Sequence, residues 1–519
     1  MKCLACAFAL ATLALPAFVS AAQTYYVAAD GSDSNSGTSL SAPWRTIGRA
    51  VKSIAPGDRI QVRAGVYNEH LELSAEDSGT PDAPKVLEAY PGEKPTLDGT
   101  GLEHRYGIDL GGDPYAKTPG ASYWVVDGFA VRNYVREGTP GFGVVSWYGS
   151  RGITLRNLDI SHVGTCVKFI GENDDLVIEN VYGHDYTGGG VDLGTHLQED
   201  GDVYLPVRRV RISRTVMIGP RGSNDTAVDG FACEVGEDIL LEDCVSEGHP
   251  GDGFDLKSDR TVLRRVRSSY ASRNGIKLWG KSARLEDSLS HDSGLEALVL
   301  QSGGSYEIVN CTIANSHEYG YTATMGEEGE TGEVTTPVLM QNCVLYANYP
   351  GNSGVLLYVA AGVQLTCEHN LFYAPLRSDA VVRWMEREFP STEFPTPWGP
   401  TDRYSDPDFV DLAGGDYRLR PDSPASASGV PRPGSMDLAR TVRGPGPADL
   451  GCYSVSAGGG TAVRGDVNGD GRVTVVDALL VLRMAVGLAS AVPSADLDGD
   501  GAVRLADAVV TLRLAVGLG

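Results

Sequence analysis

Short apolar phrases recur along the middle of the chain, each interrupted by one polar residue and followed by a turn. They read ITLRNLDI, LVIENVYG, ILLEDCVS, ARLEDSLS, EIVNCTIA and VLMQNCVL. The polar residue returns after 22 or 23 positions, as from Asp243 to Arg265 and from Asn157 to Asn180. This period predicts three short strands and three turns per coil, the repeat of a parallel β-helix. Leucine-rich repeats have a similar period, but the chain shows no sustained LxxLxL signature.

The recurring polar residues also predict a structural ladder. Coils of a β-helix stack about 4.8 Å apart, so equivalent residues line up from coil to coil. Asn and Asp tolerate a left-handed backbone and satisfy backbone groups in turns. We therefore expect one turn column made of Asn157, Asn180, Asp243, Asp287, Asn310 and Asn342.

The two ends of the chain have different patterns. Lys2, one apolar run and the small residues Ser20 to Ala22 predict a secretory signal peptide over 1–22 and a secreted protein, because the run is too short for a membrane span. A short helix over Thr46 to Ile54 is expected to cover the open first coil. We predict an all-β fold, a right-handed parallel β-helix over 23–455. A Gly-rich linker over 456–464 and a small α-helical module over 465–519 follow.

Composition excludes some partners and leaves others. A net charge of −24 argues against nucleic acid. The seven cysteines after the signal are odd in number and lie in apolar contexts, which predicts small core residues and no disulfide framework. One segment, Lys257 to Arg284, holds nine basic residues and one acid, Asp259. It indicates either a positive patch for an anionic substrate or solvated arginines on a sheet face. No later segment predicts a membrane span, and the β-helix is expected to be monomeric.

The C-terminal module contains one phrase twice, DVNGDGRVTVVD and DLDGDGAVRLAD, each followed by an apolar run of helical type. Ca²⁺ prefers six to eight oxygen ligands, which such loops supply at positions 1, 3, 5, 7 and 12 with Gly at position 6. In the first loop Gly471 makes the turn, and the predicted ligands are Asp466, Asn468, Asp470, Arg472 through its carbonyl, and Asp477. In the second loop Gly501 makes the turn, and they are Asp496, Asp498, Asp500, Ala502 through its carbonyl, and Asp507.

This duplicated loop-helix pattern resembles the dockerin family over 465–519. The resemblance implies a cohesin-type domain as partner, and hence attachment to a scaffold or a cell surface. The positions that would select the cohesin differ between the repeats, with Val475 and Val476 in one and Leu505 and Ala506 in the other. The cohesin type therefore stays open.

Three successive coil phrases, VDGFACE, GDGFDLK and RNGIKLW, carry the candidate chemistry. Aligned on their apolar-Gly core, they place Asp229 and Asp252 in one column with Asn274. Ala232, Asp255 and Lys277 share the next column outward. Because alternate residues of a strand point to opposite faces, we expect Asp255 and Lys277 to face solvent on adjacent coils.

Clustered carboxylates repel one another unless a cation lies among them, so Asp229, Asp252 and Asp255 predict a calcium site. A divalent ion near Lys277 disfavours the ammonium form, and a neutral amine is a competent general base. A metal and an amine together suit β-elimination across a uronate, in which the base removes the C5 proton and the 4-linked oxygen leaves.

At DGFA, DGFDL and NGIKLWG the sequence resembles the family 9 polysaccharide lyases, pectate lyases with a β-helix fold. The resemblance implies that Lys277 is the base and that Asp229, Asp252 and Asp255 bind a catalytic calcium. The family pattern has two Asp before the Gly, and here Gly251 stands in the first place. The predicted lining of a groove for an acidic polysaccharide is Lys257, Arg273, Trp279 and Lys281.

Other functions fit the same residues. A uronate C5-epimerase or an alginate-type lyase begins with the same proton abstraction. A glycoside hydrolase needs two carboxylates flanking the bond, and Asp252 with Asp255 or Glu296 are the candidates. A noncatalytic carbohydrate-binding β-helix displayed through the C-terminal module is the third alternative.

Overall fold

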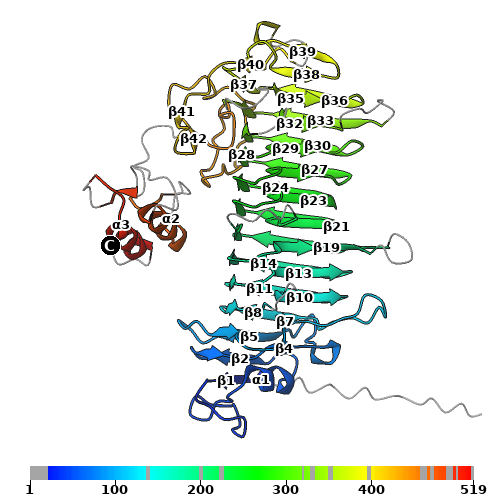
Figure 1. Cartoon of the computed structure of the whole chain (residues 1–519), viewed down its shortest axis with the longest axis vertical. Helices are drawn as coiled ribbons and strands as arrows, with labels where there is room; N and C mark the ends of the chain where they lie inside the picture. The colour runs from blue at the N-terminus through cyan, green and yellow to red at the C-terminus, as the bar shows by residue number, and fades with distance from the viewer. Residues whose placement is uncertain are drawn as a thin grey trace, which may run out of the picture.

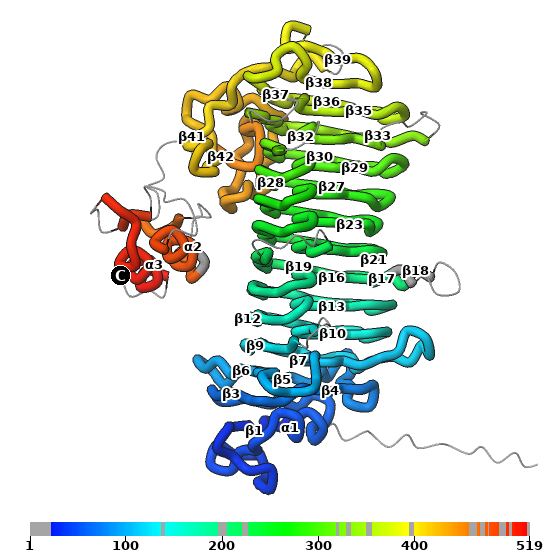
Figure 2. The backbone as a smooth tube through the Cα atoms, in the orientation of Figure 1, coloured from blue at the N-terminus to red at the C-terminus, as the bar shows by residue number. Residues whose placement is uncertain are grey.

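The computed structural model describes residues 22–135, 141–197, 203–220, 227–317, 321–327, 334–348, 355–393, 399–455, 464–467, 473–486, 495–497 and 501–515. The predicted parallel β-helix is confirmed. Successive coils stack along the long axis of the molecule (Figure 1), and the backbone tube shows the coils as a regular series (Figure 2). Each complete coil contributes three strands, one to each of three parallel faces, here called sheets 1, 2 and 3.

Sheet 1 carries the strands that matter most for the site. It consists of β4 (Leu71–Glu72), β7 (Tyr106–Asp109), β10 (Phe142–Tyr148), β13 (Thr165–Gly171), β16 (Gly189–Leu193), β21 (Phe231–Glu242), β23 (Phe254–Asp259), β26 (Ile276–Leu278), β29 (Leu298–Leu300), β32 (Tyr321–Met325), β35 (Val355–Val359) and β38 (Val382–Trp384). The hairpin partner β39 (Arg387–Phe389) pairs antiparallel with β38 at the last coil.

Sheet 2 shares the long strand β21 with sheet 1, because that strand runs through the bend between the two faces. Its other strands are β1 (Thr24–Val27), β2 (Arg59–Val62), β5 (Lys85–Ala89), β8 (Trp124–Asp127), β11 (Arg151–Arg156), β14 (Asp174–Glu179), β19 (Val207–Ser213), β24 (Thr261–Arg264), β27 (Ser282–Glu286), β30 (Ser305–Val309), β33 (Thr336–Gln341) and β36 (Val363–Glu368).

Sheet 3 closes each coil. It consists of β3 (Val66–Tyr67), β6 (Thr96–Asp98), β9 (Ala130–Arg132), β12 (Asp159–Ser161), β15 (Tyr182–His184), β20 (Val216–Ile218), β22 (Val245–Glu247), β25 (Arg267–Ser269), β28 (Leu289–Ser293), β31 (Thr312–Ser316), β34 (Val344–Tyr346), β37 (Leu371–Tyr373) and β40 (Arg403–Tyr404). Outside the three sheets lie the hairpins β17 (Thr195–Leu197) with β18 (Val203–Leu205) and β41 (Phe409–Asp411) with β42 (Asp416–Leu419).

The predicted turn column is present between sheets 2 and 3. All six predicted Asn and Asp residues adopt a left-handed backbone, with φ between 49° and 58°. Their side chains also bond along the column, since Asn180 Nδ2 donates to Asn157 Oδ1 at 2.7 Å and Asn310 Nδ2 donates to Asp287 Oδ1 at 3.1 Å. This ladder fixes the register of the coils, because shifting one strand would break both its turn and its amide bond.

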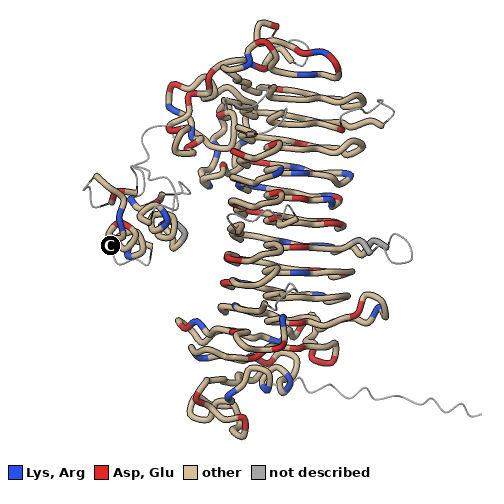
Figure 3. Tube along the Cα trace, viewed as in Figure 1, with Lys and Arg blue, Asp and Glu red and all other residues tan. Residues whose placement is uncertain are grey.

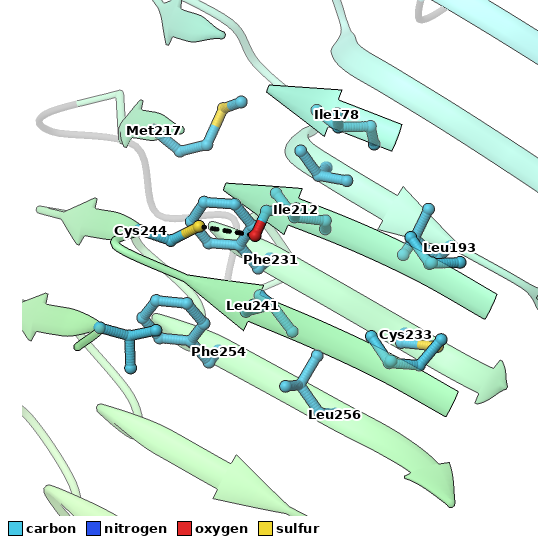
Figure 4. Close-up of a cluster of buried hydrophobic side chains, with 14 of the residues drawn as sticks. Ile178, Leu193, Ile212, Met217, Phe231, Cys233, Leu241, Cys244, Phe254 and Leu256 are labelled. Carbon is cyan, nitrogen blue, oxygen red and sulfur yellow. Dashed lines mark hydrogen bonds between the residues drawn. The ribbon is translucent and has the colours of Figure 1, made fainter. Parts of the chain in front are cut away.

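The core is a stack of inward side chains. The rings of Phe231 and Phe254 lie 4.9 Å apart and nearly parallel on adjacent coils (Figure 4). All seven described cysteines are free and buried, as predicted. They act as small apolar residues with a weak donor; Cys244 Sγ, for example, lies 3.6 Å from the Ile212 carbonyl oxygen (Figure 4).

Segments outside the coils cover the first coil and part of sheet 3. The predicted N-terminal helix is α1 (Ile47–Ser53), capped by Thr46 Oγ1, which accepts from the Arg49 N–H at 3.3 Å. Its apolar face buries Ile47 and Val51 against the first coil. After the last coil, residues 399–455 fold back over sheet 3, and Arg443 forms a fully covered ion pair with Asp287 of the turn column at 3.0 Å.

The C-terminal module contains α2 (Val475–Ala485) and α3 (Leu505–Ala515), which pack against each other. Arg483 of α2 pairs with Glu247 of sheet 3 at 3.0 Å. The module therefore contacts a face of the β-helix other than sheet 1. The predicted signal peptide and linker lie outside the described residues, apart from residues 22 and 464. Among the described helices, none has the length and apolar character needed to cross a bilayer.

Candidate active site

The site lies on the outer side of sheet 1, where β21, β23 and β26 follow one another on adjacent coils. In the strands, Ala232 pairs with Asp255 and Asp255 pairs with Lys277. In the turn before the strands, the Asp252 N–H donates to Asp229 Oδ1 at 2.7 Å. The Asn274 N–H donates to Asp252 Oδ1 at 2.9 Å. The alignment of the three coil phrases therefore predicts the same register as the structure shows.

Lys277 is held by carboxylates. Its Nζ lies 3.1 Å from Asp255 Oδ2 and 3.6 Å from Asp252 Oδ2. The same Nζ lies 4.3 Å from the centre of the Trp279 ring, within the range of a cation–π contact. These contacts fix the amine at one point above the sheet.

The expectation that Asp255 and Lys277 face solvent is wrong in one respect. Both side chains point away from the core, but only 6% of Asp255 and 9% of Lys277 is exposed. Neighbouring outward side chains, Asp252 and Trp279 among them, cover the pair. An ion pair that is excluded from water in this way interacts more strongly than a surface pair.

Burial and neighbouring negative charges disfavour the ionised forms of Asp229 and Asp252. Burial, with the charges of Asp252 and Asp255, raises the pKa of Asp229 to about 7. Burial also raises the pKa of Asp252. Asp255 Oδ1 and Asn274 Oδ1 are buried and accept no hydrogen bond from any described residue. Buried polar atoms without partners are costly, and they indicate a site built for a group that supplies the missing interactions.

The donor set suits a hard cation. Carboxylate and amide oxygens are the ligands that Ca²⁺ prefers, and the repulsion around Asp229 would be relieved by a positive charge. Among the described residues no three His, Cys, Asp or Glu side chains already form a metal-binding group. In this structure the Lys277 ammonium supplies the positive charge beside Asp252 and Asp255. The residues fit calcium in chemistry, and their oxygens would have to turn toward it.

A groove of about 650 Å³ runs beside the site along the bend between sheets 1 and 2. Of the four residues predicted to line it, Lys257, Trp279 and Lys281 do so. Arg273 is not among the lining residues: its Nε lies 3.7 Å from Asp252 Oδ1, at the opposite end of the strand. Arg273 thus belongs to the carboxylate cluster.

The basic segment Lys257 to Arg284 does not form a free positive patch. Most of its cations pair with acids of the preceding coil, as Arg260 does with Glu237 and Asp238, and Arg265 does with Glu242 and Asp243. Charges of both signs therefore alternate along the coils (Figure 3). The acids lie about one repeat upstream in sequence, outside the segment.

Further polar residues lie at the site or in its columns, beyond those predicted for the lyase. Glu234 lies one coil before Lys257 and binds its Nζ at 2.7 Å. Glu296 continues the turn column of Asp252 and Asn274, and burial raises its pKa. Lys168 and Asp192 form an ion pair further along the column of Lys277. Counting one coil back from Lys257 gives Glu234, and counting one coil forward from Asn274 gives Glu296, whereas Asp192 and Lys168 lie three and four coils before Lys277.

Comparison with known families bears directly on this site. Residues 25–288, which contain all of Asp229, Asp252, Asp255 and Lys277, match the model of the Pel9A-like, right-handed β-helix region. The chain belongs to this family. Residues 229–378 also match a general right-handed β-helix model, and residues 464–511 match the dockerin type I domain.

Individual relatives agree with that assignment. Pectate lyase PEL9 of Emericella nidulans is 42% identical over 77 residues, covering 15% of this chain and 18% of that protein. Pectate lyase L of Paenibacillus polymyxa is 24% identical over 314 residues, covering 58% and 60%. The chain thus spans less than two thirds of the curated relatives it matches. The solved structure of XylC with xylose shares the fold, with a TM-score of 0.51, 11% identity and coverage of 83% and 98%.

In the dockerin type I module, the loops are closed by their last carboxylates. Asp477 accepts from the N–H groups of Val467 and Thr474 at 2.9 and 2.8 Å, and Asp507 accepts in the same way from Leu497 and Arg504. Asp496 Oδ2 accepts from the Gly501 N–H at 2.8 Å. The predicted ligands Asp466 and Ala502 also lie within the described residues. The predicted ligands Asn468, Asp470, Arg472, Asp498 and Asp500 lie outside the described residues.

Proposed function

We propose that this Pel9A-like β-helix is a calcium-dependent polysaccharide lyase that cleaves a pectate-like polyuronide by β-elimination, with Lys277 as the general base. The observation that carries the proposal is the position of the Lys277 amine. It is fixed by Asp252, Asp255 and the Trp279 ring, beside a groove, within the segment that matches the family.

The reaction needs one proton transfer. The Lys277 amine takes the C5 proton of the uronate, the electrons of that C–H bond form the C4=C5 double bond, and the C4–O bond breaks. The leaving oxygen carries the electron pair away and then gains a proton. A base fixed by its neighbours removes the proton without searching for its orientation, which is the main advantage of a positioned catalytic group.

Asp229, Asp252 and Asp255 are the residues that would hold calcium. The ion would neutralise the uronate carboxylate, make the C5 proton more acidic, and compete with Lys277 for Asp252 and Asp255, which favours a neutral amine. Arg273 positions Asp252 from the other side of the turn.

Substrate recognition falls to the groove residues. Trp279 offers a ring face for a sugar, while Lys257 and Lys281 offer cations for uronate carboxylates. The partner acids Glu234 and Asp259 hold these cations in place until a substrate carboxylate competes for them.

The module at the C-terminus gives the enzyme its location. A dockerin type I domain supports the proposal that the protein is exported and attached to a scaffold or cell surface through a cohesin-type domain, with calcium in the two loops. The acidic loops and the predicted signal peptide over 1–22 agree with an extracellular, calcium-rich setting.

The test is a panel of polyuronides incubated with and without calcium. A rise in ultraviolet absorbance from unsaturated uronide on pectate, lost with chelator, supports the lyase. An inverted C5 centre without chain cleavage would identify an epimerase instead. Binding without any product would leave a carbohydrate-binding β-helix, and Gly251, in place of the first Asp of the family pattern, would be its leading cause.

A further inference from the structure

Three aromatic side chains gather on the outer side of sheet 1, far from Lys277. They are Tyr106 of β7 and Phe142 and Trp147 of β10. The rings of Tyr106 and Phe142 stack with centres 5.4 Å apart, and Trp147 meets them edge-on at 5.5 and 5.9 Å. All three are partly exposed, and none belongs to the core clusters of the described residues.

The cluster shares the register of the active site. Strand pairing links Val145, Lys168, Asp192, Ala232, Asp255 and Lys277 in one outward column. Two positions further along each strand, the same register places Trp147 and Trp279 in one column. Five coils separate the two tryptophans, which at about 4.8 Å per coil is about 24 Å.

The groove runs from Trp279 in the direction of the aromatic cluster. Its lining runs from Trp279 and Lys257 past Arg208 to Glu172. Glu172 Oε2 accepts a hydrogen bond at 2.9 Å from the hydroxyl of Tyr148, the residue next to Trp147. A linear chain that lies in the groove with one residue at Lys277 is therefore directed toward the aromatic cluster.

We propose that Tyr106, Phe142 and Trp147 form a remote subsite that binds a sugar ring of the acidic polysaccharide while cleavage takes place at Lys277. The inference rests on the proposed function and extends it to long substrates. A partly exposed aromatic face provides apolar contact with a polar edge, which suits the mixed surface of a pyranose. Arg105, whose guanidinium lies 5.0 Å from the Tyr106 ring centre, places a cation for a uronate carboxylate beside it.

The competing explanation is that the rings only cover Val145, which is outward and fully buried. Trp147→Leu separates the two, because leucine keeps an apolar cover and removes the aromatic face. The expected result is a rise of about three- to tenfold in KM for long polygalacturonate, with kcat unchanged. For a galacturonate trimer, which is short enough to bind at Lys277 alone, both KM and kcat should stay at their wild-type values. Tyr270 is an exposed aromatic residue on the sheet 3 side. Tyr270→Ala serves as the matched control and should leave KM and kcat unchanged for both substrates.

Unchanged KM for the long substrate, in a variant with wild-type Tm, would overturn the subsite. If Trp147→Leu fails to fold, Phe142→Leu gives the same comparison from the neighbouring position. Affinity electrophoresis in polygalacturonate provides a readout that is independent of catalysis. If the wild-type protein binds the polymer without cutting it and Trp147→Leu weakens that binding, the subsite stands and the lyase proposal falls.

Discussion

Replacing Lys277 by Met tests the electrostatics of the site without any assay of activity. The substitution keeps the length of the side chain and removes its charge. Asp252 and Asp255 are then left together with side chains only 4% and 7% exposed. Removing one member of a buried ion pair costs about 3–5 kcal/mol, whereas an exposed pair contributes about 0–1 kcal/mol. Because this pair is covered, we expect the larger loss in the free energy of unfolding.

The measurement is a urea titration of wild type and Lys277→Met with chelator and again with calcium. Calcium should restore most of the loss, because the ion takes over the neutralisation of the carboxylates. Asp255→Asn in the Lys277→Met background should also restore stability, since it removes one of the two repelling charges. A Lys277→Met protein as stable as wild type with chelator, and indifferent to calcium, would refute the reasoning that the cluster needs a cation.

Three further outcomes are expected. First, Asp229 has a pKa of about 7 when folded and 3.8 otherwise, so the folded state holds a proton that the unfolded state has lost between these values. Stability without calcium should therefore fall as the pH rises through this window, and Asp229→Asn should flatten the slope; equal slopes in chelator would contradict the pKa. Second, the isolated dockerin-type module, 465–519, should gain helix by circular dichroism only with calcium, because its short helices bury little apolar surface; equal helicity in chelator would oppose this. Third, truncation after Ser454 should leave pectate cleavage intact, because the module contacts sheet 3; lost activity would show coupling.

The sequence predicted those features that repeat. A residue such as Asn180 recurs one coil after Asn157 because each coil needs the same left-handed turn, so spacing alone gives the register. That register then placed Asp255 beside Lys277 correctly.

The sequence could not predict how far neighbouring side chains cover one another. Lys277 is buried because Trp279 and Asp252 lean over it, which depends on rotamers and not on spacing. Of the two readings of the basic segment, the positive patch fails for a related reason. Arg260 and Arg265 are neutralised by acids of the preceding coil, which a count within one segment leaves out.

The most direct test of the central claim is the initial rate of unsaturated uronide formation from polygalacturonate by wild type, Lys277→Ala and Lys277→Arg in calcium. A positioned general base contributes about 10²–10⁴-fold to the rate, so the initial rate of Lys277→Ala should fall by a factor in this range. Lys277→Arg should be almost as slow, because guanidinium stays protonated. Polygalacturonate binding should persist in both variants. Wild-type turnover by Lys277→Ala would show that another group removes the proton.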